Sequence, residues 1–313
     1  MADIKLGVLC WNQYADWQSL LEAGIRVDEL GYHSLWTWDH LYPIVGDHTG
    51  PMFEGWLTLA AWAQATKNVR IGLMVGANTF REPPLVAKMA TTLDHISNGR
   101  AVLGIGAAWF ATEHRAFGLQ FGDGPPERLR WLAEALPVMR GMLAGERPSA
   151  AGPRYHAREV INNPPPVQQR LPILIGGGGE RVTLRLVARY ADGNNVGGGI
   201  ENVRRKDRIL RQHCEAVGRD EREIERTAGI GRVVIRDSRE EARRVGAAQL
   251  DRNGGARSGS ERAVGTPEDL VELLAPYPEI GYHHLIVDLA APYDEETLVR
   301  LAREVAPKLA GLA

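Results

Sequence analysis

The segment LPILIGGGGERVTLRLVARYADG, residues 171–193, decides the fold class. It reads as a short apolar strand, a run of four glycines and then an apolar periodicity typical of a helix. Glycines between a strand and a helix let the backbone adopt positive φ and come close to a ligand. The N–H groups and the dipole of the following helix then favour an anion. The sequence therefore predicts a phosphate site formed by Gly177, Gly178, Gly179, Glu180 and Arg181. The helix is expected to start at Glu180 and Arg181.

The same alternation of strand and helix runs along the whole chain. Most of the strand-like runs are too uniformly apolar for a one-sided sheet, which indicates strands covered on both faces. Amphipathic stretches at helical spacing separate them. Eight such units favour a closed (β/α)₈ TIM barrel, with a doubly wound open sheet as the alternative. The predicted strands are residues 4–11, 34–40, 69–75, 101–108, 171–177, 194–198, 227–235 and 283–289.

No linker divides the chain, so residues 1–313 are predicted to form a single barrel domain with two insertions. The first covers about residues 118–170 and holds a helix followed by a proline-rich polar run. The second covers about residues 236–265 and holds a charged helical stretch followed by a flexible, glycine-containing loop.

Composition restricts the class of protein. The formal net charge of −2 argues against nucleic acid as a partner, since such binding needs a concentrated basic surface. Two distant cysteines suggest neither a disulfide framework nor a cysteine-rich metal site. The first residues do not resemble a signal peptide, and no stretch reaches the apolar length of a membrane span. We therefore expect a cytoplasmic protein that does not bind membranes.

Polar and aromatic residues at the ends of the predicted strands are the candidate site. SLWTWDHL, residues 34–41, ends a strand in Asp39 and His40, and a histidine beside a carboxylate can act as general acid or base near neutral pH. Neighbouring residues on a strand point to opposite sides, so one of the two braces the structure while the other faces the pocket. Directly after another strand, the small Gly76 lets the backbone approach a ring edge, and Asn78 offers it a donor and an acceptor.

Tryptophans gather in the first half of the chain, and several lie in or just after strand-like runs. In a barrel these positions build the mouth of the active site. An aromatic mouth suits a flat, conjugated ligand, and the predicted substrate pocket consists of Trp11, Trp38 and Trp109. No metal site is predicted, because the pair His283–His284 lacks a matching carboxylate at ligand spacing.

These motifs together resemble the luciferase-like monooxygenase superfamily, and most strongly its deazaflavin-dependent (coenzyme F420) oxidoreductases. The resemblance covers most of the chain in the family's order. It departs at Trp109, where relatives that oxidise a sugar phosphate carry a glutamate. It is carried by GYHSLWTWDH, IGLMVGANTFREPPLVAKMATTLDHISNGRAVLGIGAAW, PILIGGGGERVTLRLVARYADG and VGTPEDLVELL.

The resemblance implies a bacterial-luciferase-like barrel that forms homodimers or larger oligomers. It implies a flavin or deazaflavin ring lying near Asp39, His40 and a bulge at Val75–Gly76 that often holds a non-prolyl cis peptide. The cofactor phosphate would then occupy the glycine loop. His40 becomes the candidate catalytic residue, and Asn78 and Trp109 candidate cofactor contacts.

The resulting prediction is an oxidoreductase that transfers a hydride between coenzyme F420 and a small organic substrate. One alternative is an FMN-dependent monooxygenase of the same fold, which usually needs a separate cofactor reductase. Another is a non-catalytic flavin- or deazaflavin-binding protein. An isomerase or aldolase on the same barrel would want a lysine or a pair of carboxylates at strand ends, and neither is evident.

Overall fold

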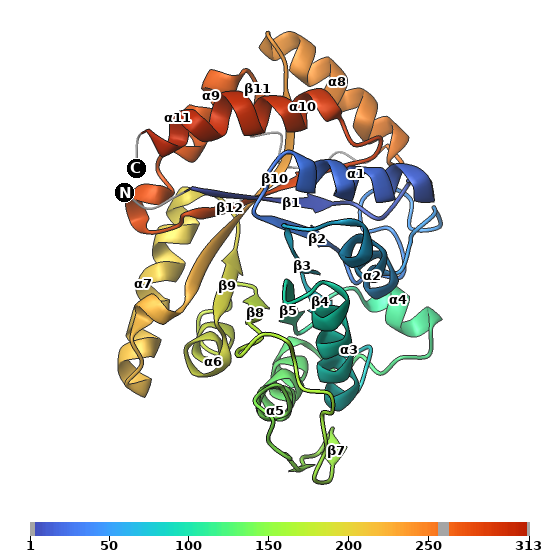
Figure 1. Ribbon diagram of the computed structural model, residues 1–313, viewed down its shortest axis with the longest axis vertical. Helices are drawn as coiled ribbons and strands as arrows, with labels where there is room; N and C mark the ends of the chain where they lie inside the picture. Colours follow the sequence, from blue (N-terminus) through green and yellow to red (C-terminus); the bar gives the residue numbers. More distant parts are fainter. Residues whose placement is uncertain (1–3, 256–262, 312–313) are drawn as a thin grey trace.

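The chain folds into a closed barrel of parallel strands surrounded by helices (Figure 1). The computed structural model describes residues 4–255 and 263–311. The strands follow one another around the ring in chain order, and the ring closes where β12 pairs with β1. The TIM-barrel prediction is therefore confirmed and the open sheet is excluded. The barrel strands are β1 Lys5–Cys10, β2 Ser34–Thr37, β3 Arg70–Leu73, β5 Ala101–Gly106, β8 Ile173–Gly176, β9 Gly193–Val196, β10 Glu225–Ile235 and β12 His284–Leu289.

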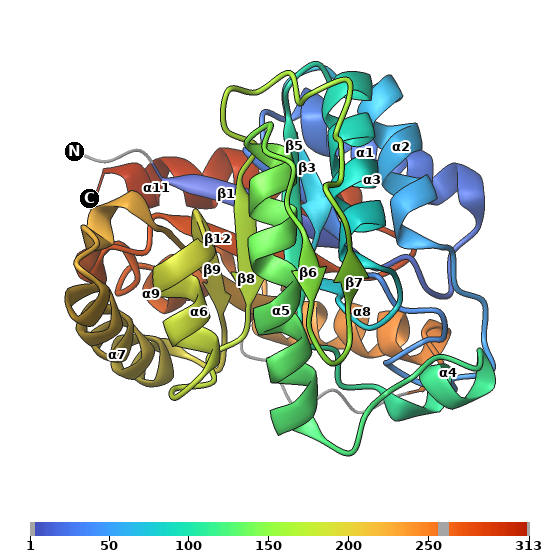
Figure 2. The same ribbon diagram turned by 90° about the horizontal axis from the view of Figure 1, so that it is seen from below.

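Four short strands lie outside this ring. β4, Gly76–Ala77, follows a bulge after β3 and pairs with β5. β11, Ala263–Gly265, pairs with the carboxyl end of β10. β6, Ala150–Ala151, and β7, His156–Ala157, form a small antiparallel hairpin that Figure 2 shows on the outside of the barrel.

Local signals explain where several helices begin. The Asp16 carboxylate caps the first helix by accepting from the Ser19 N–H, and Thr266 forms a capping box with Asp269. Pro83 occupies a first helical turn, where no donor is needed. The helices are α1 Trp17–Glu29, α2 Gly55–Ala65, α3 Pro83–Ile96, α4 Ala111–Ala116, α5 Pro125–Leu143, α6 Thr183–Tyr190, α7 Ile200–Val217, η1 Glu221–Glu223, α8 Arg239–Arg252, α9 Pro267–Leu274, η2 Pro278–Ile280, α10 Glu295–Arg300, the π-helical turn η3 Leu301–Val305 and α11 Ala306–Ala310.

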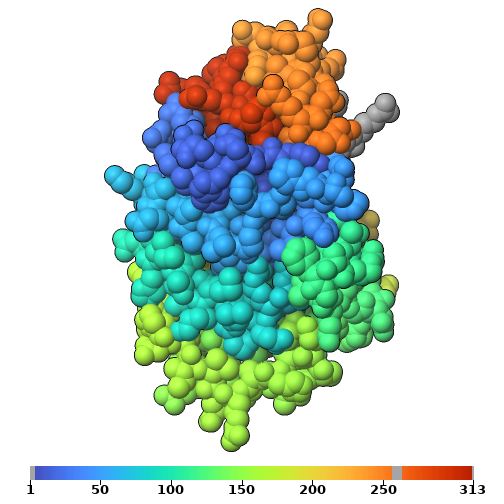
Figure 3. Space-filling view, turned by 90° about the vertical axis from the view of Figure 1, so that its right-hand side faces the viewer, coloured from blue at the N-terminus to red at the C-terminus, as the bar shows by residue number. Residues whose placement is uncertain are grey.

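The two predicted insertions differ in character. Within residues 118–170, α5 packs between α3 and α6, which makes it one of the barrel's own helices; the β6–β7 hairpin is the added part. Within residues 236–265, α8 lies beside α10 at one end of the molecule (Figure 3). The predicted loop of this second insertion falls on residues 256–262, outside the described residues.

Apolar side chains form two layers. One fills the space between the strands and the helices. The other fills the barrel interior, since inward-facing residues alternate along each strand; it includes Leu9, Trp11, Trp36, Trp38 and Ile286. Among the described helices, none has the length and apolar character needed to cross a bilayer.

A polar cluster closes the amino-terminal end of the barrel. The Glu225 carboxylate accepts from the Lys5 ammonium at 2.9 Å and lies 3.3 Å from Nδ1 of His284. His33 stacks edge-on against His284, with ring centroids 4.9 Å apart. Within the described ranges, the ligating atoms of His33, Glu225 and His284 come within 4.8 Å of one another, a grouping that the sequence did not suggest. The sequence indicated no carboxylate near His284, whereas the structure places Glu225 beside it, paired with Lys5.

Burial and the neighbouring His284 and Lys5 lower the pKa of His33 to about 4. An unfolded chain binds a proton on this imidazole near pH 6.5, whereas the folded chain does so only near pH 4, so stability is lost as the pH falls through that interval. The wild type should lose unfolding free energy between pH 7 and pH 4, and we expect His33→Gln to reduce that loss by on the order of 1–3 kcal/mol. Urea denaturation between pH 4 and pH 7 measures it. His156→Gln, at an exposed position, is the control, and an equal flattening in both variants would contradict the assignment.

Candidate active site

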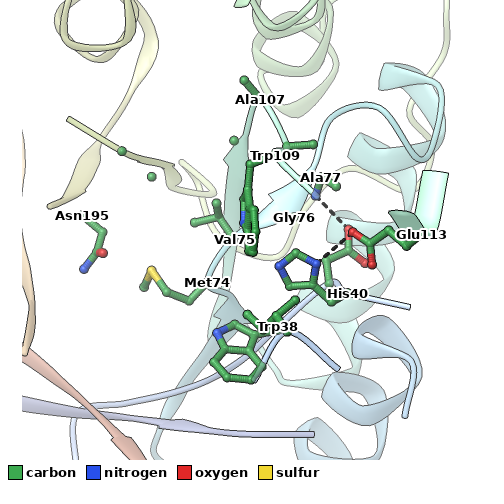
Figure 4. A pocket seen from close by; sticks show the side chains of 16 residues that line it. Trp38, His40, Met74, Val75, Gly76, Ala77, Ala107, Trp109, Glu113 and Asn195 are labelled. Carbon is green, nitrogen blue, oxygen red and sulfur yellow. Dashed lines mark hydrogen bonds and ion pairs between the residues drawn. The ribbon is translucent and has the colours of Figure 1, made fainter. Parts of the chain in front are cut away.

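A cavity of about 390 Å³ opens at the carboxyl end of the barrel strands, the end where TIM barrels place their active sites (Figure 4). Glycine and alanine backbone forms one wall and larger apolar side chains form the other, so the space suits a flat ring. The lining residues are Trp38, Asp39, His40, Ile44, Met74, Val75, Gly76, Ala77, Gly106, Ala107, Ala108, Trp109, Glu113, Gly176, Gly177 and Asn195.

His40 faces this cavity and is oriented by Glu113. Its Nδ1 lies 2.9 Å from Oε1 of Glu113, whose other oxygen accepts from the Leu41 N–H at 2.8 Å. Glu113 comes from α4 and is only 1% exposed. A carboxylate accepts hydrogen bonds only, so Nδ1 is the donor in this contact, and in the neutral imidazole Nε2 carries the lone pair. Nε2 points into the cavity (Figure 4).

Asp39 points the other way and braces the wall. Its carboxylate accepts two hydrogen bonds from Arg81 and one from the Ala77 N–H. Arg81 also donates to Glu54 at 2.7 Å. Burial raises the pKa of Asp39 to about 6, against the opposing effects of Arg81 and Ala77. The alternation predicted for this pair is thus observed: Asp39 holds the backbone after the bulge and His40 faces the cavity.

The bulge between β3 and β4 places Val75 at the centre of the wall. The peptide bond between Met74 and Val75 is cis, one residue before the position that the family resemblance suggested. A Cβ on Gly106 would lie 2.8 Å from a methyl group of Val75, and a Cβ on Gly176 would meet both of its methyl groups at the same distance. Only glycine fits at these two strand ends.

The rest of the glycine loop follows different constraints. Gly177 has a φ of +109°, whereas Gly178 does not adopt positive φ. A Cβ on Gly178 would meet only carbons of the flexible Lys206 side chain, at 3.1–3.4 Å, while a Cβ on Gly179 would lie 2.6 Å from the Thr183 hydroxyl. Gly178 is therefore the loop position that the fold itself constrains least.

The helix after this loop begins later than the sequence suggested. α6 starts at Thr183, and Glu180 and Arg181 belong to a turn before it. Glu180 accepts from Lys206 at 2.7 Å and from Arg205 at 3.0 Å, both on α7, and these bonds lower its pKa. The Glu180 carboxylate is thus neutralised beside the predicted phosphate site.

The predicted site residues divide into two groups. The cavity lining brings together Trp38, Asp39, His40, Val75, Gly76, Trp109 and Gly177. Trp11 lies outside the lining and packs against Trp38, with ring centroids 5.0 Å apart. The Asn78 amide is buried and donates to the Tyr155 hydroxyl at 3.0 Å, so it is directed away from the cavity. Gly178, Gly179, Glu180 and Arg181 continue the loop beyond the lining.

Three polar residues of the site were not singled out as site residues from the sequence. Glu113 lies 73 residues from His40 in the sequence, and that spacing gives no sign of their contact. Asn195 lies in β9, the weakest of the predicted strands, and lines the cavity. Arg81 follows the bulge in an exposed-looking charged run, yet it forms the ion pair with Asp39.

Comparisons with known proteins agree on one family. The model of the luciferase-like monooxygenases matches residues 4–264. An F420-dependent glucose-6-phosphate dehydrogenase of Microbacterium testaceum is 28% identical, over 93% of each chain. The structure of an F420-dependent secondary alcohol dehydrogenase in complex with an F420-acetone adduct superposes with a TM-score of 0.81 at 20% identity, over 98% of this chain and 99% of the other. The FMN complex of a type II Baeyer-Villiger monooxygenase component from Pseudomonas putida gives 0.77 at 18% identity, over 98% and 99%.

The glycine loop permits a test of what each glycine does. Gly177→Ala forces a side chain into positive φ and should cost about 1–2 kcal/mol of stability. Gly178→Ala needs only a small shift of Lys206 and should leave the melting temperature within a degree or two of the wild type. Thermal unfolding of the two variants measures the contrast. A larger loss for Gly178→Ala than for Gly177→Ala would contradict it.

Proposed function

This chain belongs to the luciferase-like monooxygenase family, and from that premise we propose that it is an oxidoreductase transferring a hydride between coenzyme F420 and a small organic substrate. The observation that carries the proposal is His40, held by Glu113 with a free Nε2 facing an open cavity. Relatives whose names include F420-dependent dehydrogenases support the choice of cofactor.

The cavity fits a deazaflavin ring. A flat space between a glycine-rich wall and apolar side chains accepts a three-ring system, and Val75 would support one of its faces. The Gly177 N–H donates to the Asn195 carbonyl oxygen at 2.9 Å, so the backbone N–H groups of Gly178 and Gly179 would meet the phosphate. When bound, the deazaflavin accepts or donates a hydride, that is, one proton together with two electrons.

His40 manages the proton that accompanies the hydride. In the oxidation of an alcohol, Nε2 of His40 would accept the O–H proton while the bound deazaflavin would supply the acceptor for the hydride from the C–H bond, leaving a carbonyl group. Glu113 keeps the imidazole in the tautomer that can accept this proton and stabilises the imidazolium that results. In the reverse direction the protonated His40 donates to the carbonyl oxygen.

Asp39 has a supporting role in this proposal. Its bonds to Arg81 and the Ala77 N–H hold the chain on both sides of the bulge, so the wall against the ring keeps its shape. The two acidic side chains thus act through other groups, one through the imidazole and one through the backbone.

Two alternatives are tested by the same site. An FMN-dependent monooxygenase would use the same loop, and FMN is present in one structural neighbour. A cofactor-storage protein would have no need of a histidine with a free nitrogen beside an open space. We further propose a homodimer or larger oligomer in the cytoplasm, with a separate reductase only if FMN is the cofactor.

Titration of the purified protein with F420 and with FMN tests the proposal. We expect F420 to bind more tightly than FMN in fluorescence-quenching titrations. Tighter binding of FMN would favour the monooxygenase, and binding of neither would contradict the proposed function.

His40→Ala should lower turnover of the alcohol by roughly 10²–10⁴-fold, the usual effect of losing a general base. The dissociation constant for F420 should change much less. Glu113→Gln should also lower turnover. The glutamine amide can donate to Nδ1 and so favour the tautomer protonated at Nε2, which cannot accept the proton of the alcohol. Steady-state kinetics and F420 titrations of both variants check this. Loss of cofactor affinity with normal turnover at saturating F420 would withdraw the catalytic role of His40.

Gly178→Val should weaken F420 binding by roughly tenfold or more, about 1.4 kcal/mol, since its side chain would block the approach of the phosphate. The matched control is the affinity for riboflavin, which lacks a phosphate, measured with the same variant. Equal losses of affinity for F420 and riboflavin would show that the substitution disturbs the fold and not the phosphate contact.

A further inference from the structure

The space beside the proposed ring site is bordered by aromatic and apolar side chains. Trp38, Ile44, Met74 and Trp109 supply most of its large surfaces. Trp109 is 60% exposed. Its ring meets His40 edge-on at 5.4 Å and lies tilted against Phe110 at the same distance. An exposed indole beside the proton-transfer group is a surface available for stacking.

Positive charge is lacking along this lining. None of its described residues is a lysine or arginine, and two are acidic. Behind the wall, Arg81 forms ion pairs with Asp39 and Glu54. Arg128 is buried, donates to the Ala108 carbonyl oxygen and stacks on Phe121 at 3.9 Å.

Lys206 and Arg205, both on α7, lie beside the glycine loop at the cavity's edge and are paired with Glu180. Lys206 also approaches Gly178. The proposed function assigns that loop to the cofactor's own phosphate. A second phosphate, carried by the substrate, would find no cationic group among the described lining residues, and desolvating its two charges there would be costly.

We propose that the substrate is an uncharged, largely apolar alcohol or its carbonyl product, bound with its apolar face on Trp109, and not a phosphate ester. This inference rests on the proposed function. The substrate's single oxygen meets Nε2 of His40, and its reacting carbon lies between that nitrogen and the ring. Trp109 thereby selects for shape and apolar surface, while His40 selects for the oxygen.

Binding to the F420-loaded protein tests the inference without a known turnover substrate. Calorimetric titrations use acetophenone as the apolar ketone, acetone as its small counterpart and glucose 6-phosphate as the phosphate ester. We expect acetophenone to bind more tightly than acetone, and glucose 6-phosphate to show no saturable binding. Trp109→Ala should weaken acetophenone binding about tenfold and affect acetone much less.

Phe117→Ala is the matched control, since Phe117 is another exposed aromatic, 52% exposed, that lies outside the cavity lining. It should leave both ketones unaffected. Glucose 6-phosphate binding as tightly as acetophenone would overturn the inference, and so would unchanged acetophenone affinity in Trp109→Ala. Failure of F420 to load the protein would instead count against the proposed function, so the two can be distinguished.

Discussion

The site depends on the close packing of Val75 against the ends of two neighbouring strands. Its methyl groups occupy the space that a Cβ on Gly106 or Gly176 would take. Because both strand ends are glycine, the bulge after β3 can move toward the barrel axis and form one wall of the cavity. A side chain at either glycine would require Val75 to shift from its place in the wall.

Two acidic residues then fix what surrounds that wall, each through a different partner. Asp39 joins the strand end before the cavity to the backbone after the bulge, and Arg81 neutralises it. Glu113 reaches from a separate helix to the imidazole of His40. The arrangement leaves Nε2 of His40 facing the cavity, and both acidic residues of the described lining are paired, Asp39 with Arg81 and Glu113 with His40.

Much of the fold could be predicted because its signals are local. Apolar runs marked most of the barrel strands, and the helices showed a clear period. The run at residues 194–198 is the exception, since it begins with two asparagines. The candidate site was predicted less completely. His40 and Trp109 lie at strand ends, where the fold alone directs side chains to the mouth. The contact between Glu113 and His40 joins elements 73 residues apart, and no pattern along the chain encodes it.

Conversely, two features that looked diagnostic of a ligand site largely serve the fold. Asn78 follows a strand, as a ligand-binding residue would, but its side-chain amide donates to the hydroxyl of Tyr155. The four glycines suggested one common purpose, yet Gly176 makes room for Val75, Gly177 adopts positive φ and Gly179 avoids Thr183. Only Gly178 is left without a requirement of the fold. A crystal structure of the protein with bound F420 is the most direct test of this arrangement. We predict that the deazaflavin ring lies against Val75 with Nε2 of His40 facing its reactive edge, and that the phosphate lies on the backbone N–H groups of Gly178 and Gly179. A ring bound away from Val75, or a phosphate held at another loop, would contradict it.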